Sequence, residues 1–164
     1  MNIKNYLRIL SGISILFLSF PAQSQTAGNF DGNKAERDSL INTGNAIRAA
    51  FLKGDADKIL LYHHPEVIKT LNYNTIQKGI VAVKSGLKGT LDSFTLEFTE
   101  NKIESLLISN GTAVEQTLFT IKGTPKAGGI PFIFKGRSMI VYVKYKGSPT
   151  GWATIREMIQ PFTE

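Results

Sequence analysis

Three stretches decide the fold of this chain: AVEQTLFTI (113–121), FIFKGRSMIVYVKY (132–145) and WATIREMIQ (152–160). Each is rich in β-branched and aromatic residues, and glycine- or proline-containing segments separate them, a pattern typical of strands joined by turns. The sequence therefore predicts three long antiparallel strands in succession. We expect the earlier elements of the chain to cover one face of the sheet that these strands form.

Alternation of apolar and polar residues predicts more strand immediately upstream. Residues 94–99 alternate with the two-residue period of a half-buried strand. The alternation slips near Asn101 and resumes over residues 103–108, which predicts a bulge that bends the sheet. Asn110-Gly111 is a strong signal for a two-residue hairpin turn. Asn110-Gly111-Thr112 also matches a glycosylation sequon, and of the two interpretations we favour the hairpin tip.

Helical periodicity dominates the part of the chain before these strands. Residues 34–53 repeat apolar side chains at three- and four-residue spacing, which predicts a first helix with one apolar stripe. Gly54 is expected to end this helix and Asp55 to begin a second, over residues 56–62. A short strand and a third helix are expected next, over residues 66–71 and 79–91. Helices followed by a bent antiparallel sheet indicate the α+β class.

Composition excludes several classes of protein. The chain has 164 residues, a one-domain length, and its 42% of hydrophobic residues can form a packed core. The formal charge is +6, but Lys4 and Arg8 supply two of these charges, and no basic cluster of the kind that binds nucleic acid follows. We therefore expect no nucleic-acid partner. The chain has no cysteine, so no disulfide can stabilise it.

The first 24 residues have the pattern of a secretory signal peptide. A short basic segment (2–8) precedes an apolar run (9–20), and Pro-Ala-Gln-Ser ends the pattern. We predict cleavage near Ser24, a flexible leader over residues 25–33 and one domain over residues 34–162. The apolar run is short compared with the roughly 20 residues of a spanning helix, so no stable membrane anchor is expected. The predicted location is outside the cytoplasm, periplasmic or secreted.

Several local motifs occur together in an order that resembles a known superfamily. Gly54-Asp55 ends the first helix, Gly79 opens another helix after a short strand, and Gly111 is followed by Ala113. Gly136-Arg137 leads into an apolar strand, and Gly151 precedes the last strand. This pattern resembles the nuclear transport factor 2-like superfamily, most closely its SnoaL-like and related small bacterial branches. The resemblance implies a cone-shaped, curved antiparallel sheet packed against about three N-terminal helices, with a pocket in the wide end.

The same resemblance implies several kinds of function. Members of the superfamily act as isomerases, as polyketide cyclases or as binding and assembly modules without enzymatic activity. The ketosteroid isomerase-like members use a carboxylate base at a position that falls near Lys69 or Thr70 here, and neither residue is a carboxylate. They also use an acid on a later strand, and the matching residues 138–145 contain no Asp or Glu. The sequence therefore carries no catalytic signature of that chemistry.

Five side chains are the candidates for lining or closing the pocket. The end of the second helix is expected to lie over the mouth, and the long strands supply the remainder from below. Glu115 points either into the pocket or toward a cross-strand cation, and Arg137 has the same ambiguity; Trp152 fits a core position as well as a ligand contact. The candidate ligand-binding residues are Tyr62, His64, Glu115, Arg137 and Trp152.

No metal site, cofactor or catalytic residue is predicted. His63 and His64 are adjacent, and on a helix their side chains diverge by about 100°, too far to chelate one ion; we interpret them as a helix-end pair.

The favoured function is an exported protein that binds a small apolar or amphipathic molecule. The alternatives are a cyclase, isomerase or hydrolyase that uses Glu115 or His64 as an acid–base group, and an interaction module. The strand stretch 139–145 is apolar on both faces, which predicts a homodimer paired through sheet faces.

Overall fold

The computed structural model describes residues 32–162, which form three helices and six strands. The helices are α1 (Lys34–Lys53), α2 (Ala56–Leu60) and α3 (Gly79–Ser93). The strands are β1 (His63–Asn72), β2 (Thr75–Lys78), β3 (Phe94–Ser109), β4 (Thr112–Pro125), β5 (Phe132–Lys144) and β6 (Trp152–Pro161). The predicted signal peptide and residues 25–31 of the predicted leader lie outside the described residues. In the described part of the chain, no helix has the length and apolar character to span a membrane.

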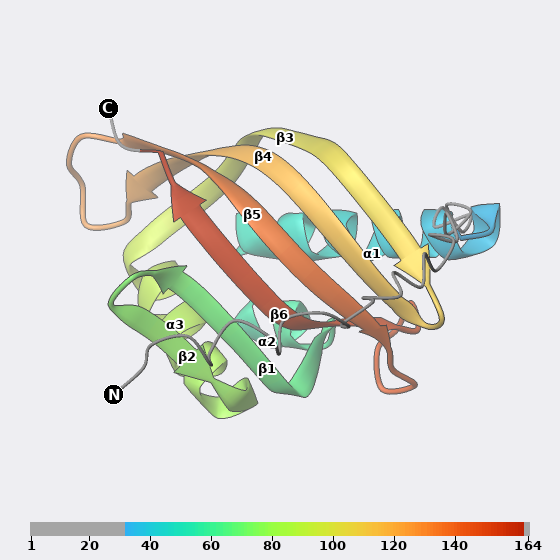
Figure 1. Ribbon diagram of the computed structural model, residues 1–164. Helices are drawn as coiled ribbons and strands as arrows, with labels where there is room; N and C mark the ends of the chain where they lie inside the picture. Colours follow the sequence, from blue (N-terminus) through green and yellow to red (C-terminus); the bar gives the residue numbers. More distant parts are fainter. Residues whose placement is uncertain (1–31, 163–164) are drawn as a thin grey trace, which may run out of the picture.

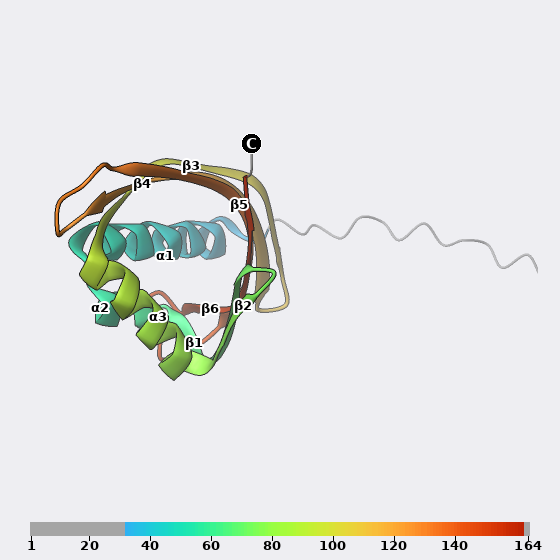
Figure 2. The same cartoon turned by 90° about the vertical axis from the view of Figure 1, so that its left-hand side faces the viewer.

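The six strands form one sheet in the order β2-β1-β6-β5-β4-β3. Neighbours pair antiparallel except β1 and β6, which run parallel. The sheet curves around α1, while α2 and α3 close the remaining side (Figures 1 and 2). The predicted α+β class, with three helices and a curved sheet, is confirmed. The sheet is mostly antiparallel, as predicted, with the β1–β6 pair as its one parallel pair among the described strands.

Local capping residues define the first two helices. Asn33 caps α1 by accepting a hydrogen bond from the backbone N–H of Glu36 at 2.9 Å. Gly54 ends the helix in the left-handed region at φ 67°, where a residue without Cβ is favoured. Asp55 then caps α2 through the N–H of Lys58 at 2.9 Å. The predicted boundary between the two helices is confirmed.

The second helix ends at Leu60, two residues earlier than predicted: Leu61 and Tyr62 form a turn, and β1 begins at His63. The predicted second helix is confirmed with a shorter end, and the helix-end interpretation of the two histidines is wrong, because both lie in β1. The physical reason is Pro65: the residue before a proline is disfavoured in helical conformation, so His64 is extended. Strand β2 was not predicted at all; it returns antiparallel to β1 after the turn at Tyr73 and Asn74.

Irregularities in β3 bend the sheet as the sequence predicts. Its register with β4 shifts twice, between Phe98 and Glu100 and between Ile103 and Ser105, on either side of the predicted bulge. Asn110 and Gly111 connect β3 to β4 with positive φ angles of 49° and 75°. Those angles fit a tight hairpin turn, so the predicted hairpin at the sequon is confirmed.

Two apolar cores join α1 to the sheet. Leu40, in the first half of α1, packs in a core with Trp152, Tyr142 and Ile108. Ala50, near the end of α1, lies in a second core with residues of α2, α3, β1 and β3. Both anchoring side chains are fully buried. The helix is therefore fixed at two points along its length, and its middle lies between the cores.

Two glycine-to-alanine substitutions distinguish a crowded glycine from an open one. A Cβ at Gly136 would lie 2.9 Å from the Gln160 carbonyl oxygen and 2.9 Å from Phe119 Cζ, whereas a Cβ at Gly89 would meet nothing within 4 Å. We expect Gly136→Ala to lower the free energy of unfolding by about 1–3 kcal/mol through overpacking. Gly89→Ala, in helix α3, should raise it by up to about 1 kcal/mol. Urea denaturation checks both, and an undiminished stability of Gly136→Ala would contradict the packing described.

Candidate functional site

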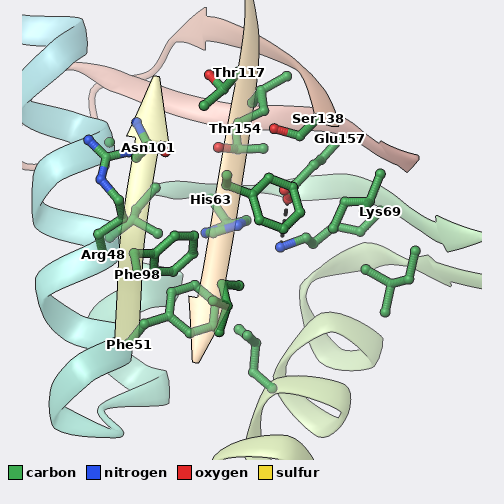
Figure 3. Close-up of a pocket in the computed structure, with 18 of the residues that line it drawn as sticks. Arg48, Phe51, His63, Lys69, Phe98, Asn101, Thr117, Ser138, Thr154 and Glu157 are labelled. Carbon is green, nitrogen blue, oxygen red and sulfur yellow. Dashed lines mark ion pairs between the residues drawn. The ribbon is translucent and has the colours of Figure 1, made fainter. Parts of the chain in front are cut away.

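A cavity of about 220 Å³ lies between α1, α3 and the inner face of the sheet. Figure 3 shows side chains from both helices and from several strands converging on it. Helix α1 contributes Gly44, Ile47 and Arg48, which lie between Leu40 and Ala50, and Phe51, which follows Ala50. The cavity therefore occupies the space beside the part of α1 that lies between the two cores.

Four phenylalanines form one continuous part of the wall. Phe51 contacts Phe98 with ring centroids 5.7 Å apart, Phe98 lies 6.3 Å from Phe119, and Phe119 lies 5.7 Å from Phe134. All four rings line the cavity. These distances and the tilted or edge-on angles are those of favourable aromatic pairs. We call this set the phenylalanine wall; it offers a ligand a large apolar surface.

The three charged side chains that line the cavity from the strands lie in a single row across the sheet. Glu115 on β4 pairs with Ile140 on β5, Ile140 with Glu157 on β6, and Glu157 with Lys69 on β1. Neighbouring strands lie 4.7–4.9 Å apart, so the backbones at the two glutamates are roughly 10 Å apart. Both carboxyl groups thus belong to the same wall of one cavity, with Ile140 between them.

The two glutamates of this row have opposite environments. Glu157 Oε2 lies 2.6 Å from Lys69 Nζ in a buried ion pair, drawn as a dashed line in Figure 3. Glu115 is 2% exposed and accepts a 2.8 Å hydrogen bond from the Thr117 hydroxyl, but no cation of residues 32–162 forms an ion pair with it. Burial therefore raises the pKa of Glu115, and the Thr117 hydrogen bond and the charge of Arg48 offset this only in part. A buried acid with a raised pKa can hold a proton at a pH at which an exposed glutamate would not.

Arg48 approaches the same region from α1. Its guanidinium lies over Gly44: a Cβ at that glycine would be 3.1 Å from Nη1. Nη2 donates a 2.7 Å hydrogen bond to Asn45 Oδ1. Burial lowers the pKa of Arg48, while the nearby Glu115 acts in the opposite direction. The glycine in the middle of α1 thus makes room for a partly buried cation at the cavity.

His63 contributes a neutral ring at the base of β1. Its Nδ1 lies 2.9 Å from the Ile59 carbonyl oxygen, and since a carbonyl can only accept, Nδ1 carries the hydrogen. In the neutral ring Nε2 is then an acceptor. Burial, and secondly the charge of Lys69, lower the pKa of His63 to about 4. His63 is therefore a hydrogen-bond acceptor in the cavity wall at neutral pH.

Only Glu115 among the five predicted ligand-binding residues lines this cavity. Arg137 lies on the outer face of the sheet, where its Nε donates a 2.7 Å hydrogen bond to Glu104. Trp152 is fully buried in the core beside Leu40, with Lys144 Nζ 3.9 Å from its ring centre. Tyr62 is buried and precedes β1, and His64 packs edge-on against Tyr145, 4.9 Å between centroids. Tyr62, His64, Arg137 and Trp152 therefore lie outside the lining of this cavity, which corrects the prediction that they line it. A ligand contact at Glu115 stays a prediction.

The correction for Arg137 has a simple cause in the register. Leu118 pairs with Arg137, so the odd-numbered inner residues of β4 face the even-numbered inner residues of β5. Glu115 is odd and points inward, and Arg137 is odd and points outward. A one-residue change of phase exchanges the faces of a strand.

Sequence reasoning missed most polar groups of the cavity. His63 was assigned to a helix end, and Lys69 was considered only as a failed carboxylate position. The alternation of β1 could have placed Lys69 inward with Val67, since both are buried. No local pattern singles out Arg48 or Glu157. Within residues 32–162, no three His, Asp or Glu side chains gather as a metal site would require.

Comparison with known proteins gives the fold but no closer relationship. No protein-family model matches the sequence, and no curated protein sequence matches it. Among solved structures, a conserved protein from Planctomyces limnophilus is 17% identical, with 79% of this chain and all of that chain covered and a TM-score of 0.71. A ketosteroid isomerase-like protein from Erwinia carotovora is 13% identical, with coverage of 80% and 100% and a TM-score of 0.67.

A third structure names the fold. A nuclear transport factor 2-like superfamily protein from Salmonella enterica is 16% identical, with 79% of this chain and 92% of that chain covered and a TM-score of 0.64. At these identities the likeness shows the fold alone. The predicted nuclear transport factor 2-like fold is confirmed.

Adjacent histidines provide a matched test of the buried ring. The unfolded chain takes up a proton at His63 near its ordinary pKa of 6.5, whereas the folded chain does so near 4. Stability from His63 is therefore complete above pH 6.5 and is lost as pH falls toward 4, by up to about 3 kcal/mol. Urea denaturation between these pH values should show this loss. In the wild-type protein every titrating group contributes to the measured loss of stability. The two variants described next isolate the part that comes from His63.

His63→Asn should remove the loss, because an asparagine amide can still donate to the Ile59 carbonyl but does not titrate. His64→Asn makes the same change one residue further along at a side chain that is only half-buried. It should leave the pH dependence unchanged. Equal pH dependence of His63→Asn and wild-type would contradict the buried neutral ring.

Proposed function

We propose that this protein binds a small amphipathic molecule in the cavity shown in Figure 3. The observation that supports this proposal is that the lining of the cavity has an apolar part and a polar part. The phenylalanine wall supplies the apolar surface, and buried polar groups face the same space from the strands. Ligand sites are mostly apolar, with a few convergent polar groups that fix orientation. At 220 Å³ the cavity is smaller than the roughly 300–1,000 Å³ of pockets for drug-sized molecules. The ligand is accordingly small.

The polar groups supply complementary hydrogen-bonding roles. His63 Nε2 accepts a hydrogen bond, and a protonated Glu115 donates one. Their own chain satisfies these groups incompletely, since Glu115 has one hydrogen bond, from Thr117, and Nε2 has none among the described residues. A molecule with a polar end and an apolar body would meet both halves of the wall. An interaction module without a ligand has no need of such an opening in its interior.

Export remains part of the proposal. It rests on the basic segment, apolar run and small-residue end of residues 1–24. Cleavage near Ser24 would release a protein of the periplasm or the exterior. The ligand would then be a molecule present outside the cytoplasm.

A proton-transfer enzyme is the second candidate, and the raised pKa of Glu115 favours it. Perturbed acids in cavities are frequent in acid–base catalysis. One structural neighbour is named as ketosteroid isomerase-like, and the present cavity also holds Tyr142, whose pKa burial raises well above its usual value. In this reading Glu115 moves the proton, and His63 rather than His64 is the histidine within the cavity.

Native mass spectrometry of the protein purified from its own host tests the cavity. We expect a retained small molecule in wild-type and its loss in Ser138→Leu, because Ser138 is buried and lines the cavity. Ser105→Leu is the matched control, the same change at an exposed β3 position. Retained molecules that differ by a shifted double bond or by one water would favour the enzyme. Equal retention by Ser138→Leu would count against the site.

We also propose a homodimer through the outer face of the sheet. Large apolar side chains there are exposed by about half: Ile76 53%, Leu107 47%, Met139 51% and Met158 61%. Met139 pairs directly with Met158, so the apolar surface continues across strands. A two-fold partner is the commonest cover for such a face.

Sedimentation equilibrium at micromolar concentration should give the mass of a dimer. Met139→Lys should weaken association by about tenfold or more, because it would place a charge at the centre of a desolvated interface. Leu52→Lys is the control, since Leu52 is equally exposed but lies on α1. A monomer mass for wild-type would rule out this dimer.

A further inference from the structure

One cation that lines the cavity, Arg48, has no ion pair among the described residues. Of the three cationic or histidine side chains that line it, Lys69 is neutralised by Glu157 and His63 is uncharged. Arg48 is close enough to Glu115 for each to shift the pKa of the other, yet no direct ion pair joins them. The hydrogen bond to Asn45 uses one of its five donor hydrogens. Most of the guanidinium is therefore free to bind a ligand.

We propose that the polar end of the cavity binds the carboxylate of a small aromatic or other apolar acid, held between the guanidinium of Arg48 and the carboxyl group of Glu115. The inference rests on the proposed function and adds the chemical class of the ligand. Two parallel N–H groups of a guanidinium match the two oxygens of a carboxylate. A protonated Glu115 donates a further hydrogen bond to the same anion.

Charge balance favours an anion over a neutral polar group. While Glu115 holds its proton, the positive charge of Arg48 is uncompensated in a partly buried position. A charge removed from water is stabilised by a paired and hydrogen-bonded counter-ion. A ligand carboxylate supplies that counter-ion and brings the charge of the site to zero.

The remainder of the wall sets the size and character of the acid. The phenylalanine wall borders the same cavity and suits an aromatic ring or a short hydrocarbon chain. A more highly charged anion such as phosphate would leave apolar surface unfilled and its second charge unpaired. The cavity therefore fits an acid with one carboxylate and one compact apolar body.

The state of Glu115 couples this binding to pH. Other titratable groups face it from the elements packed against it: Arg48 on α1, Tyr142 on β5, Glu157 on β6, and Lys69 with His63 on β1. Glu157 and Lys69 balance each other, and Tyr142 stays neutral. When Glu115 loses its proton, its carboxylate compensates the positive charge of Arg48. The same carboxylate then repels the negatively charged carboxylate of the ligand. Affinity should fall as pH rises through the pKa of Glu115.

Isothermal titration calorimetry with phenylacetate and its neutral isostere phenylacetamide tests the class of ligand. At a pH at which Glu115 is protonated, phenylacetate should bind about tenfold tighter or more. Arg48→Gln should remove that preference, and Arg48→Lys should keep part of it. The control is Arg156→Gln, an exposed arginine outside the cavity wall, which should leave both affinities unchanged. Equal affinity for the two compounds, or an unchanged preference in Arg48→Gln, would overturn the carboxylate.

A pH series adds a readout that a merely structural effect would not give. Wild-type should lose affinity for phenylacetate as pH rises through the range in which Glu115 loses its proton, whereas Glu115→Gln, which cannot ionise but can still donate, should retain it. A wild-type affinity that does not change with pH would overturn the role of Glu115. Failure of both compounds to bind would also overturn the inference. The proposed function would then be judged separately by the retained molecule and by Ser138→Leu.

Discussion

The two-point anchoring of α1 is the constraint on which the cavity depends. Leu40 fixes one end of the helix in the core of Trp152 and Tyr142, and Ala50 fixes the other in the core against α2, α3 and β1. Side chains in such cores are close-packed, so the helix cannot sink toward the sheet between them. The interval carries Gly44, Ile47 and Arg48: Ile47 packs against the second core, and all three border the cavity. An opening beside α1 follows from the spacing of its anchors.

Environment separates two glutamates of the same row. Glu157 and Glu115 occupy equivalent inward positions on β6 and β4, with Ile140 between them. Lys69 reaches Glu157 from β1, but no cation in the described part of the chain pairs directly with Glu115. The Glu157 carboxylate is held in an ion pair within the fold, whereas the Glu115 carboxyl group is left available for chemistry or recognition. The difference arises from which strand lies next to which, and not from either residue's own neighbours in sequence.

The sequence predicted local structure well and the site only in part. Alternation and turn residues located the strands, and capping residues located the boundary between α1 and α2. Alternation within β4 also offered Glu115 as an inward residue. The facing of Arg137 depended on the register between strands, which no single stretch contains. Arg48 could not be found because its role comes from the gap at Gly44 and from a strand distant in the sequence.

The parallel pairing of β1 with β6 also determines when the cavity can form. His63 and Lys69, on β1, are joined to the Glu115 side of the wall only through β6, which follows every other element along the described chain. Contacts between residues so distant in sequence form slowly, because a long loop must close before they gain any stability. Helix α1 and the β3–β4 hairpin can form from local contacts alone. We therefore expect the cavity to be completed late in folding, by the strand that closes the sheet.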